Sequence, residues 1–423
     1  MTRATKLKII CGVVALGLPG PSAVMAIGPT VEIVSQGTTI TAPGYPGVGR
    51  VLPARLHGSV SVSAGYDDNP NAGGGLGGAQ AGGQGTATTN VNVNLSYSGK
   101  IGRAQVNLLT GTGLVFYPLS GSNRGTDTNS FARLSASYPV SLRLMLTGDV
   151  SATYGVEPDL SSDAGLDRRA GNFLNLDSNF SARYRWSLRL SNSASYGIRV
   201  VSYDDPGSEG AFLNRMEQTF GGDLSFRLSL RSTVSAEYRL TVTDADLALR
   251  DSTTQFLLGG FDYRVSVRTR AVIRAGVTLR SENAIDRIDP NFAGSLSYSL
   301  GPRGALAWNV GYSIEQGNTR QATTRMTART GLSLSYLISY RLSANVGLNY
   351  HHDQSDGGAF SPFPGATGST STEDAYDVSL GLQYVLNRRF TIQGSYTHSE
   401  VISDQAFRSY ARNRFSVGVN FSF

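Results

Sequence analysis

The chain lacks the residues on which disulfide and thiol chemistry depend. Its single cysteine, Cys11, lies in an N-terminal segment that we expect to be removed, so the mature chain has none. This excludes a disulfide framework and a thiolate nucleophile. Lysine is nearly absent too, because past that segment the only one is Lys100 and the other cations are arginine. The formal net charge of +6 is spread without a basic cluster, which argues against nucleic acid as a partner.

Long hydrophobic runs are also missing. Residues of the set AVILMFWYC make up only 40% of the 423 residues, which is low for a soluble core of this length. The apolar run Ile9 to Leu18 follows three cations and precedes a small-residue cleavage site at Ala26. It is shorter than the roughly 20 residues that cross a bilayer as a helix, and the pattern is typical of a secretory signal peptide.

The division of the chain follows from this segment and from the prolines after it. We predict a signal peptide over residues 1–26 and a periplasmic N-terminal extension over residues 27–56, which contain Pro29, Pro43, Pro46 and Pro53. Residues 57–423 then form one domain. In that domain apolar and polar residues alternate, as in Ala271, Ile273, Ala275, Val277 and Leu279, with arginines between them. A period of two predicts strands with one apolar and one polar face.

The fold class that this alternation predicts is all-β, a transmembrane antiparallel up-and-down β-barrel. About 18 strands can be counted, with 16 as the fallback because the strand around Phe256 is nearly continuous in apolar residues. Lipid would cover the apolar face and water the polar one. Short turns, such as Pro139 to Ser141, alternate with long Gly-rich connections, such as Asp67 to Thr88, which predicts that the short turns are periplasmic.

Aromatic residues support a membrane setting. Tyrosines that come just before short turns, among them Tyr138, Tyr184 and Tyr263, would form a girdle at the periplasmic interface. The chain ends in a strand whose apolar set is Phe415, Val417, Val419, Phe421 and Phe423. This strand resembles the C-terminal strand of bacterial outer-membrane proteins, which the barrel assembly machinery recognises. We therefore expect a location in the outer membrane of a Gram-negative bacterium.

Taken together, these elements resemble the type-2 group of outer-membrane beta-barrel porins. The resemblance covers roughly residues 57–423 and rests on the pattern of strands, girdle and final aromatic, with no fingerprint motif. Members of the group recur near polysaccharide gene clusters. The resemblance therefore implies a porin-like channel for polar solutes or glycans, linked to export or uptake of polysaccharide.

Other functional classes have weaker support. The glycines of Gly73 to Gly85 have neither the strand nor the helix that a phosphate loop needs, so a flexible loop is the better interpretation. His351 and His352 point to opposite faces of a strand, so we predict no metal site there. No Ser or Asp is matched with a His on one face, which disfavours an enzyme. We predict no cofactor. The alternatives that stay open are a structural or adhesive barrel with a blocked lumen and a lipid-modifying barrel enzyme.

The arginines on the polar face are the main candidates for function. Parity predicts that they line the lumen together with some acids: Arg189, Arg199, Arg227, Arg239, Arg268, Arg270, Arg274, Arg280, Arg325, Arg329, Arg341, Glu237 and Asp223. Two interpretations carry equal weight. Either acids and bases pair across strands to hold the wall, or the excess of arginine biases the channel toward anions or acidic sugars. Expected partners are outer-membrane lipid and lipopolysaccharide, the barrel assembly machinery and a polar or polysaccharide cargo. The sequence leaves the oligomeric state open.

Overall fold

The computed structural model of the chain describes residues 55–70, 85–118, 126–155, 172–204, 214–246, 250–282, 285–317, 322–357, 370–404 and 409–423. These residues form 18 strands and a short 3-10 helix, η3 (Gly301–Arg303). No helix among them has the length and apolar character needed to span a membrane. The predicted signal peptide, nearly all of the predicted periplasmic extension and most of the loop Gly73 to Gly85 lie outside the described residues.

Within the described residues the strands follow one another along the chain, with η3 between β12 and β13. The first nine are β1 (Arg55–Asp67), β2 (Thr86–Ile101), β3 (Ala104–Phe116), β4 (Thr126–Pro139), β5 (Leu144–Gly155), β6 (Phe173–Arg185), β7 (Leu190–Tyr203), β8 (Arg215–Arg227) and β9 (Ser232–Ala245). The second nine are β10 (Ser252–Arg264), β11 (Thr269–Glu282), β12 (Ile285–Ser299), β13 (Gly304–Gln316), β14 (Ala322–Leu337), β15 (Leu342–Gly357), β16 (Ser371–Val385), β17 (Phe390–Ser403) and β18 (Tyr410–Ser422).

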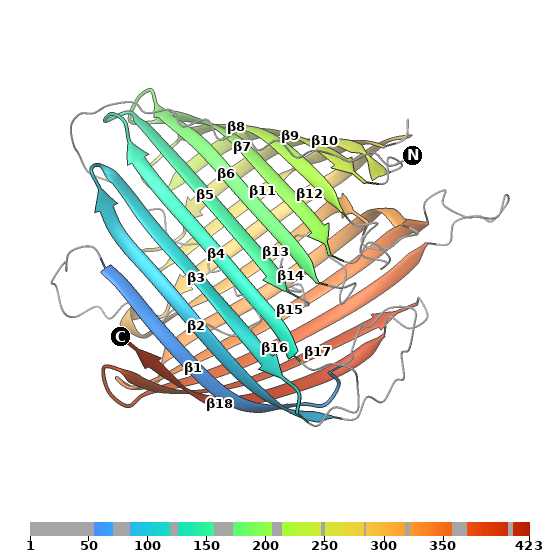
Figure 1. Ribbon diagram of the computed structural model, residues 1–423. Helices are drawn as coiled ribbons and strands as arrows, with labels where there is room; N and C mark the ends of the chain where they lie inside the picture. Colours follow the sequence, from blue (N-terminus) through green and yellow to red (C-terminus); the bar gives the residue numbers. More distant parts are fainter. Residues whose placement is uncertain are drawn as a thin grey trace, which may run out of the picture.

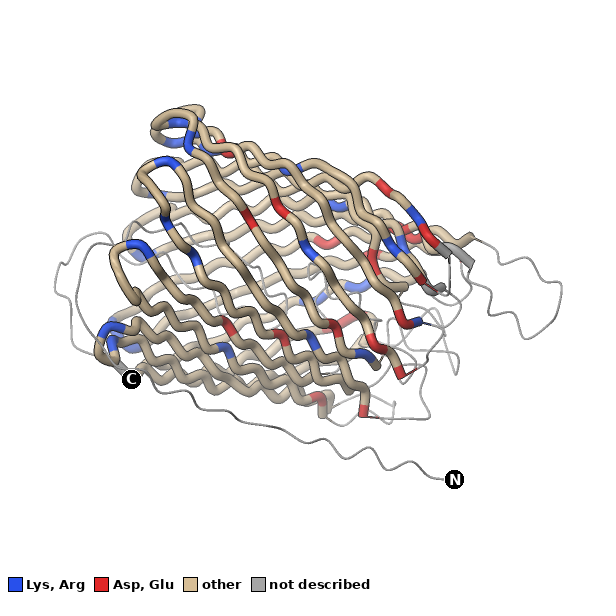
Figure 2. The backbone as a smooth tube through the Cα atoms, turned by 90° about the horizontal axis from the view of Figure 1, so that it is seen from above, with Lys and Arg blue, Asp and Glu red and all other residues tan. Residues whose placement is uncertain are grey.

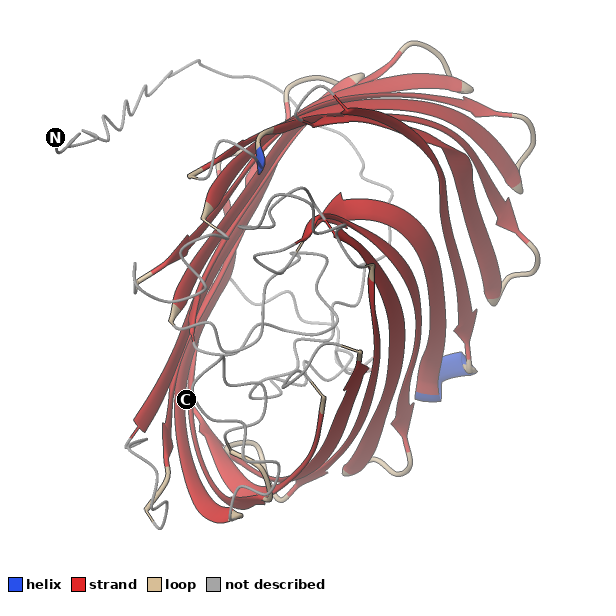
Figure 3. Ribbon diagram, turned by 90° about the vertical axis from the view of Figure 1, so that its right-hand side faces the viewer, coloured by secondary structure: helices blue, strands red, loops and turns tan. Residues whose placement is uncertain are grey.

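The sheet closes on itself. Each strand pairs antiparallel with its neighbours in the chain, and β1 pairs with β18, with Val60 opposite Phe421 and Tyr66 opposite Phe415. Figure 1 shows β1 and β18 side by side, and Figure 3 shows the strands forming a closed wall. The prediction of an 18-strand up-and-down barrel is confirmed. The least regular of the predicted strands, around Phe256, is β10.

The two faces of the sheet differ as the alternation requires. On β18, Phe415, Val417 and Val419 are exposed, whereas on the neighbouring β1 the polar Ser61 and Ser63 are buried. Large exposed apolar side chains recur on this outward face of every strand except β7 and β14, and this is the surface that lipid would cover. Each strand is 12 to 16 residues long, more than the about 9–11 residues that cross a bilayer.

The two ends of the barrel differ in their connections. Eight hairpin turns, between β2 and β3, β4 and β5 and so on to β16 and β17, are short, and we call this the short-turn end. The beginning of β1 and the end of β18 also lie there, since Ser59 is opposite Ser422. The opposite, long-loop end carries the remaining connections, several of which fall outside the described residues.

Candidate functional site: the inner wall of the barrel

Small neutral polar side chains form a hydrogen-bonded row on the inner wall of the first strands. Ser98 donates to Asn107 at 2.7 Å, and Asn107 donates in turn to Ser135 at 3.4 Å, so one chain of side chains crosses β2, β3 and β4. These residues are directly opposite one another in the register. Cross-strand hydrogen bonds of this kind satisfy a polar face while leaving its surface uncharged.

Charge is concentrated on β13 to β15 toward the long-loop end. Arg325 donates to Glu315 and to Asp353, both at 2.7 Å, and it thereby joins the three strands. Arg329 donates to the same Glu315 carboxylate at 2.7 Å. Arg325 and Asp353 are buried. The two arginines therefore neutralise two acids within one cross-strand cluster.

A second cluster extends over β6 to β11 and includes buried groups. Arg199 lies 2.9 Å from Asp177 and 3.7 Å from Glu217. Arg215 is 2.6 Å from the same Glu217. Further along the wall, Arg280 lies 3.2 Å from Glu282, which also accepts a hydrogen bond from Thr324 at 3.0 Å.

Arg239, Arg270 and Arg274 are more exposed but are also paired. Glu237 lies 2.8 Å from Arg239 and 3.7 Å from Arg274. Its cross-strand neighbour is Asp223, which accepts a hydrogen bond from Ser225 at 2.7 Å. Arg270 donates to Asp262 at 3.0 Å.

The strand arginines thus favour the wall-holding interpretation over a free positive lining. Each of the seven that lie within strands at these positions, namely Arg199, Arg239, Arg270, Arg274, Arg280, Arg325 and Arg329, has an acid within 4 Å. Cross-strand pairs of opposite charge stabilise a sheet, and a paired guanidinium attracts an external anion less than a free one does.

The other four predicted lining arginines are not in the body of the wall. Arg189, Arg268 and Arg341 lie in short turns, each one residue before a strand, and Arg227 is the last residue of β8. All four are exposed. Figure 2 shows this end of the barrel, near the C-terminus, marked by blue segments, while red segments lie along the strands and toward the other end. Alternation along the sequence predicts the face on which these four arginines lie. It does not show whether an arginine belongs to a strand or to a turn.

A possible cation-binding group appears where the sequence predicted none. His351, Asp353 and Glu373 each offer one ligand atom, and these atoms lie within 4.8 Å of one another. Asp353 and Glu373 are directly opposite each other on β15 and β16. Asp353 already lies 2.7 Å from Arg325, whose guanidinium supplies the positive charge that a metal ion would bring. His352 is on the other face, 2.8 Å from Asp374, as the alternation predicted.

Several pairings in the wall could not be predicted from the sequence because they depend on register. Glu315 and Glu373 carry no local pattern that marks them as partners of Arg325 or His351. The pair Arg412 and Asp67 is 345 residues apart, and it joins β18 to β1 with an Nε to Oδ1 distance of 2.9 Å. Only the closure of the barrel brings these buried side chains together.

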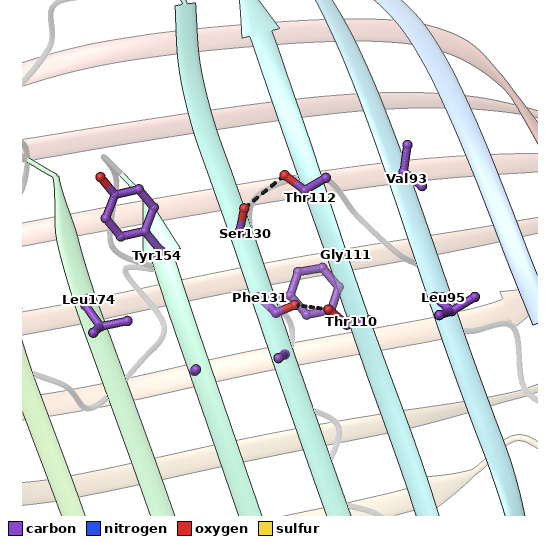
Figure 4. A pocket seen from close by; sticks show the side chains of 11 residues that line it. Val93, Leu95, Thr110, Gly111, Thr112, Ser130, Phe131, Tyr154 and Leu174 are labelled. Atoms are coloured by element: carbon purple, nitrogen blue, oxygen red, sulfur yellow. Dashed lines mark hydrogen bonds between the residues drawn. The ribbon is translucent and has the colours of Figure 1, made fainter. Parts of the chain in front are cut away.

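The described residues also include a shallow hollow on the outward face of β2 to β6, of about 450 Å³. Val93, Leu95 and Leu174 surround it, and Thr112 hydrogen-bonds to Ser130 at 2.9 Å within it (Figure 4). Because it lies on the lipid side, it is separate from the lumen.

The residues expected to form the assembly signal lie at the seam. Phe415, Val417, Val419 and Phe421 face outward on β18, and Phe423 follows the strand. Phe415 contacts the ring of Tyr396 at a centroid distance of 4.7 Å, and Phe421 contacts Phe390 at 5.2 Å. They therefore form an apolar edge where the barrel closes.

A closed barrel with an apolar outside and a polar, charge-paired inside defines a protein of the outer-membrane β-barrel class. The family described as "Putative beta-barrel porin 2" matches residues 55–423, and the chain belongs to this family. It is a porin-like barrel of the outer membrane of Gram-negative bacteria.

Solved structures with a similar arrangement include other outer-membrane proteins. OpdK of Pseudomonas aeruginosa, solved with vanillate, has 13% identity and a TM-score of 0.44, with 87% of this chain and 99% of that chain covered. The siderophore receptor PirA of Acinetobacter baumannii has 9% identity and a TM-score of 0.43, with 88% and 81% covered. A search of curated protein sequences gives no match.

Proposed function

We propose that the protein is a non-enzymatic channel that passes polar solutes or glycans across the outer membrane, in connection with polysaccharide export or uptake. The observation that carries this proposal is the closed 18-strand wall with a polar inner face. Barrels of about 16–18 strands are wide enough for an aqueous bore. The mechanism is diffusion of the solute along hydroxyl, amide and paired ionic groups of the wall. No residue of the wall needs to catalyse a reaction.

The chemistry of the wall suits a sugar. Serine and asparagine chains such as Ser98–Asn107–Ser135 offer both donors and acceptors at neutral sites, so they can exchange hydrogen bonds with hydroxyl groups. The charges deeper in the wall are paired, and paired charges do not hold a passing solute strongly. The link to polysaccharide rests on the family resemblance. Cargo, lipopolysaccharide and the assembly machinery remain proposed partners.

A second candidate is a barrel that does not conduct. Inward side chains toward the long-loop end are almost fully buried, with Thr278 at 0% and Thr327 and Asp353 at 1% exposure. These three side chains are therefore shielded from water in this structure. A structural or adhesive role would follow if the bore were closed at that level.

Conductance of the purified mature protein in planar lipid bilayers separates these two functions. We expect stepwise channels that are blocked in a concentration-dependent way by neutral dextran added to the bath. Heat-denatured protein is the control. A matched pair of deletions, residues 71–84 and residues 358–369, removes loop sequence and leaves β1, β2, β15 and β16 intact. If neither the full protein nor the deletion variants conduct, the proposed channel function is wrong and a non-conducting barrel is supported.

A further inference from the structure

Six of the eight short turns share one sequence and one hydrogen-bonding pattern. A Ser or Asn is followed two residues later by arginine in Ser141-Leu142-Arg143, Ser187-Leu188-Arg189, Ser229-Leu230-Arg231, Ser266-Val267-Arg268, Ser339-Tyr340-Arg341 and Asn387-Arg388-Arg389. In each turn the side-chain oxygen accepts the backbone N–H of the arginine at 2.9 to 3.4 Å. We call these six arginines the rim arginines.

The turns hold the rim arginines in equivalent positions. The carbonyl of each rim arginine accepts a backbone N–H from the end of a neighbouring hairpin at 2.8 Å in all six cases, as Arg143 does from Arg185. A Ser or Asn oxygen that bonds to the N–H two residues later is a turn-forming motif with little freedom. The backbone therefore presents one guanidinium at the same point of each of these hairpins.

The turns also separate apolar from charged side chains. In five of the six turns the residue before the rim arginine is apolar or aromatic and strongly exposed, from 63% at Leu142 to 100% at Val267, and in the sixth turn it is Arg388. The residue after Arg143 is Leu144, which opposes the outward-facing Tyr184. Alternation therefore assigns the rim arginine to the lumen side and its apolar neighbours to the membrane side.

The rim arginines are not neutralised. Within the part of the chain that the structure describes, none of the six is in an ion pair, in contrast to the seven strand arginines of the wall. The eight short turns contain no Asp or Glu, and the other two carry Arg103 and Arg303, with Lys100 near the end of β2. Asp262, two residues before the end of β10, is paired with Arg270. The short turns at this mouth therefore carry cations and no acidic side chain.

The spacing of the rim arginines points to a polymer. Arg143, Arg189, Arg231 and Arg268 occupy four consecutive turns. Turns are two strands apart, so successive arginines are roughly 10 Å apart along the rim, at about 4.8 Å per strand. A single small anion would contact only one rim arginine at a time. A chain that carries a carboxylate, sulfate or phosphate on every sugar or two would meet several, and its affinity would rise by multivalency.

We propose that the rim arginines form a binding site for an acidic polymer at the periplasmic mouth of the barrel. The inference rests on the proposed function for the side on which the short turns lie and for the passage of a polymer. Arginine keeps its charge and binds carboxylate, sulfate and phosphate through paired N–H donors. An acidic glycan is collected from the periplasm at this mouth before it enters the neutral part of the wall.

Binding to the purified full-length mature protein tests the site without requiring conduction. The probe is fluorescein-labelled dextran sulfate, followed by anisotropy in nonionic detergent, with neutral dextran as the reference. We expect Arg143→Gln, Arg189→Gln, Arg231→Gln and Arg268→Gln together to weaken binding about tenfold or more and to flatten its salt dependence, because fewer ionic contacts are made. The same four positions changed to Lys should keep most of the affinity.

A matched variant controls for net charge. Arg133→Gln, Arg183→Gln, Arg239→Gln and Arg274→Gln together remove the same charge from arginines within strands and should change binding less than threefold if the rim is the site. Equal loss in both variants, or unchanged binding in the rim variant, would overturn the proposal. Retained heat-modifiable migration in gels shows that each variant is folded.

An experiment with different lipids distinguishes binding of a polymer from binding of lipid headgroups. In nanodiscs of phosphatidylglycerol we expect the dextran sulfate to bind as it does in phosphatidylcholine. If phosphatidylglycerol abolishes binding of dextran sulfate, the rim arginines are occupied by lipid phosphate and the proposal of a polymer-binding site is wrong. Conductance is measured separately, so a protein that binds dextran sulfate at the rim but never conducts would refute the channel and leave the binding site standing.

Discussion

Arg325 shows what the paired charges of the wall do at the scale of one residue. Its guanidinium lies between Glu315 and Asp353, which come from the two neighbouring strands, and all three groups are removed from water. A charge in such surroundings is stable only while its partners remain, because the interior cannot replace the hydration it has lost. The cluster therefore stabilises β13, β14 and β15 as a unit.

Replacing this arginine should destabilise the barrel. Arg325→Gln removes the arginine partner of the buried Asp353 and leaves Glu315 with Arg329 alone. We expect a loss of about 3–5 kcal/mol in the free energy of unfolding, the range seen when one partner of a buried ion pair is removed. Urea unfolding in lipid vesicles, followed by the fluorescence of Trp186 and Trp308, measures this loss.

The matched control is Arg274→Gln. Arg274 has a side chain that is 50% exposed and lies 3.7 Å from its acid, so the expected loss is at most about 1 kcal/mol. Equal losses in the two variants would mean that burial does not decide the role of the wall arginines.

At the scale of elements, the strands could be predicted from the sequence and their partners could not. The face that a residue occupies is a local property with a period of two, so the sequence predicts even β10 as a strand, although Phe256 to Phe261 contain no polar side chain. Register is not local. Glu315 and Asp353 meet Arg325 only through two strand pairings, and Asp67 meets Arg412 only when the barrel closes. Parity assigned Arg189 and Arg268 to the lumen side but gave no sign that a turn rather than a strand holds them.

The seam between β1 and β18 should be intolerant of a side chain at Gly418. A Cβ there would lie 2.5 Å from the carbonyl oxygen of Val62 and from the Cβ of Ser63, so the strands would have to separate. For Gly418→Ala we expect a loss of about 1–3 kcal/mol, typical of overpacking, together with less heat-modifiable folded protein in gels.

Gly311→Ala is the control within the same kind of strand. Its Cβ would meet nothing closer than the Phe292 carbonyl oxygen at 3.7 Å, so we expect folding yields like those of the unchanged protein. If Gly418→Ala folds equally well, close approach of the strands is not what limits closure.

At the scale of the whole molecule, charge is arranged along the barrel axis. The short-turn end carries cations without acids in its turns, while most of the acids lie along the strands and at the other end, near the arginines with which they pair (Figure 2). Unpaired charge at one mouth and paired charge elsewhere produce an asymmetric electric potential. An open channel built this way treats anions differently from its two ends.

Three arginines that are close in sequence allow the contribution of the mouth to anion preference to be compared with that of the wall. Arg268 is a rim arginine, whereas Arg270 pairs with Asp262 and Arg274 with Glu237. In bilayers with a tenfold KCl gradient, we expect Arg268→Gln to lower the preference for chloride more than Arg270→Gln or Arg274→Gln does, as judged by the reversal potential. Equal effects of the three would place the anion preference in the wall.

The asymmetry should also appear as rectification of single channels. At about 0.05 M KCl the field of the rim arginines extends over more than 10 Å, and currents of opposite sign should differ in magnitude. At about 1 M KCl the screening length is near 3 Å, so the difference should nearly vanish. Neutralising Arg143, Arg189, Arg231 and Arg268 together should abolish rectification at low salt, and the four-arginine wall variant should retain it. Rectification that survives in the rim variant, or that persists at 1 M KCl, would mean that the shape of the bore rather than the charge of its mouth sets the direction in which anions pass.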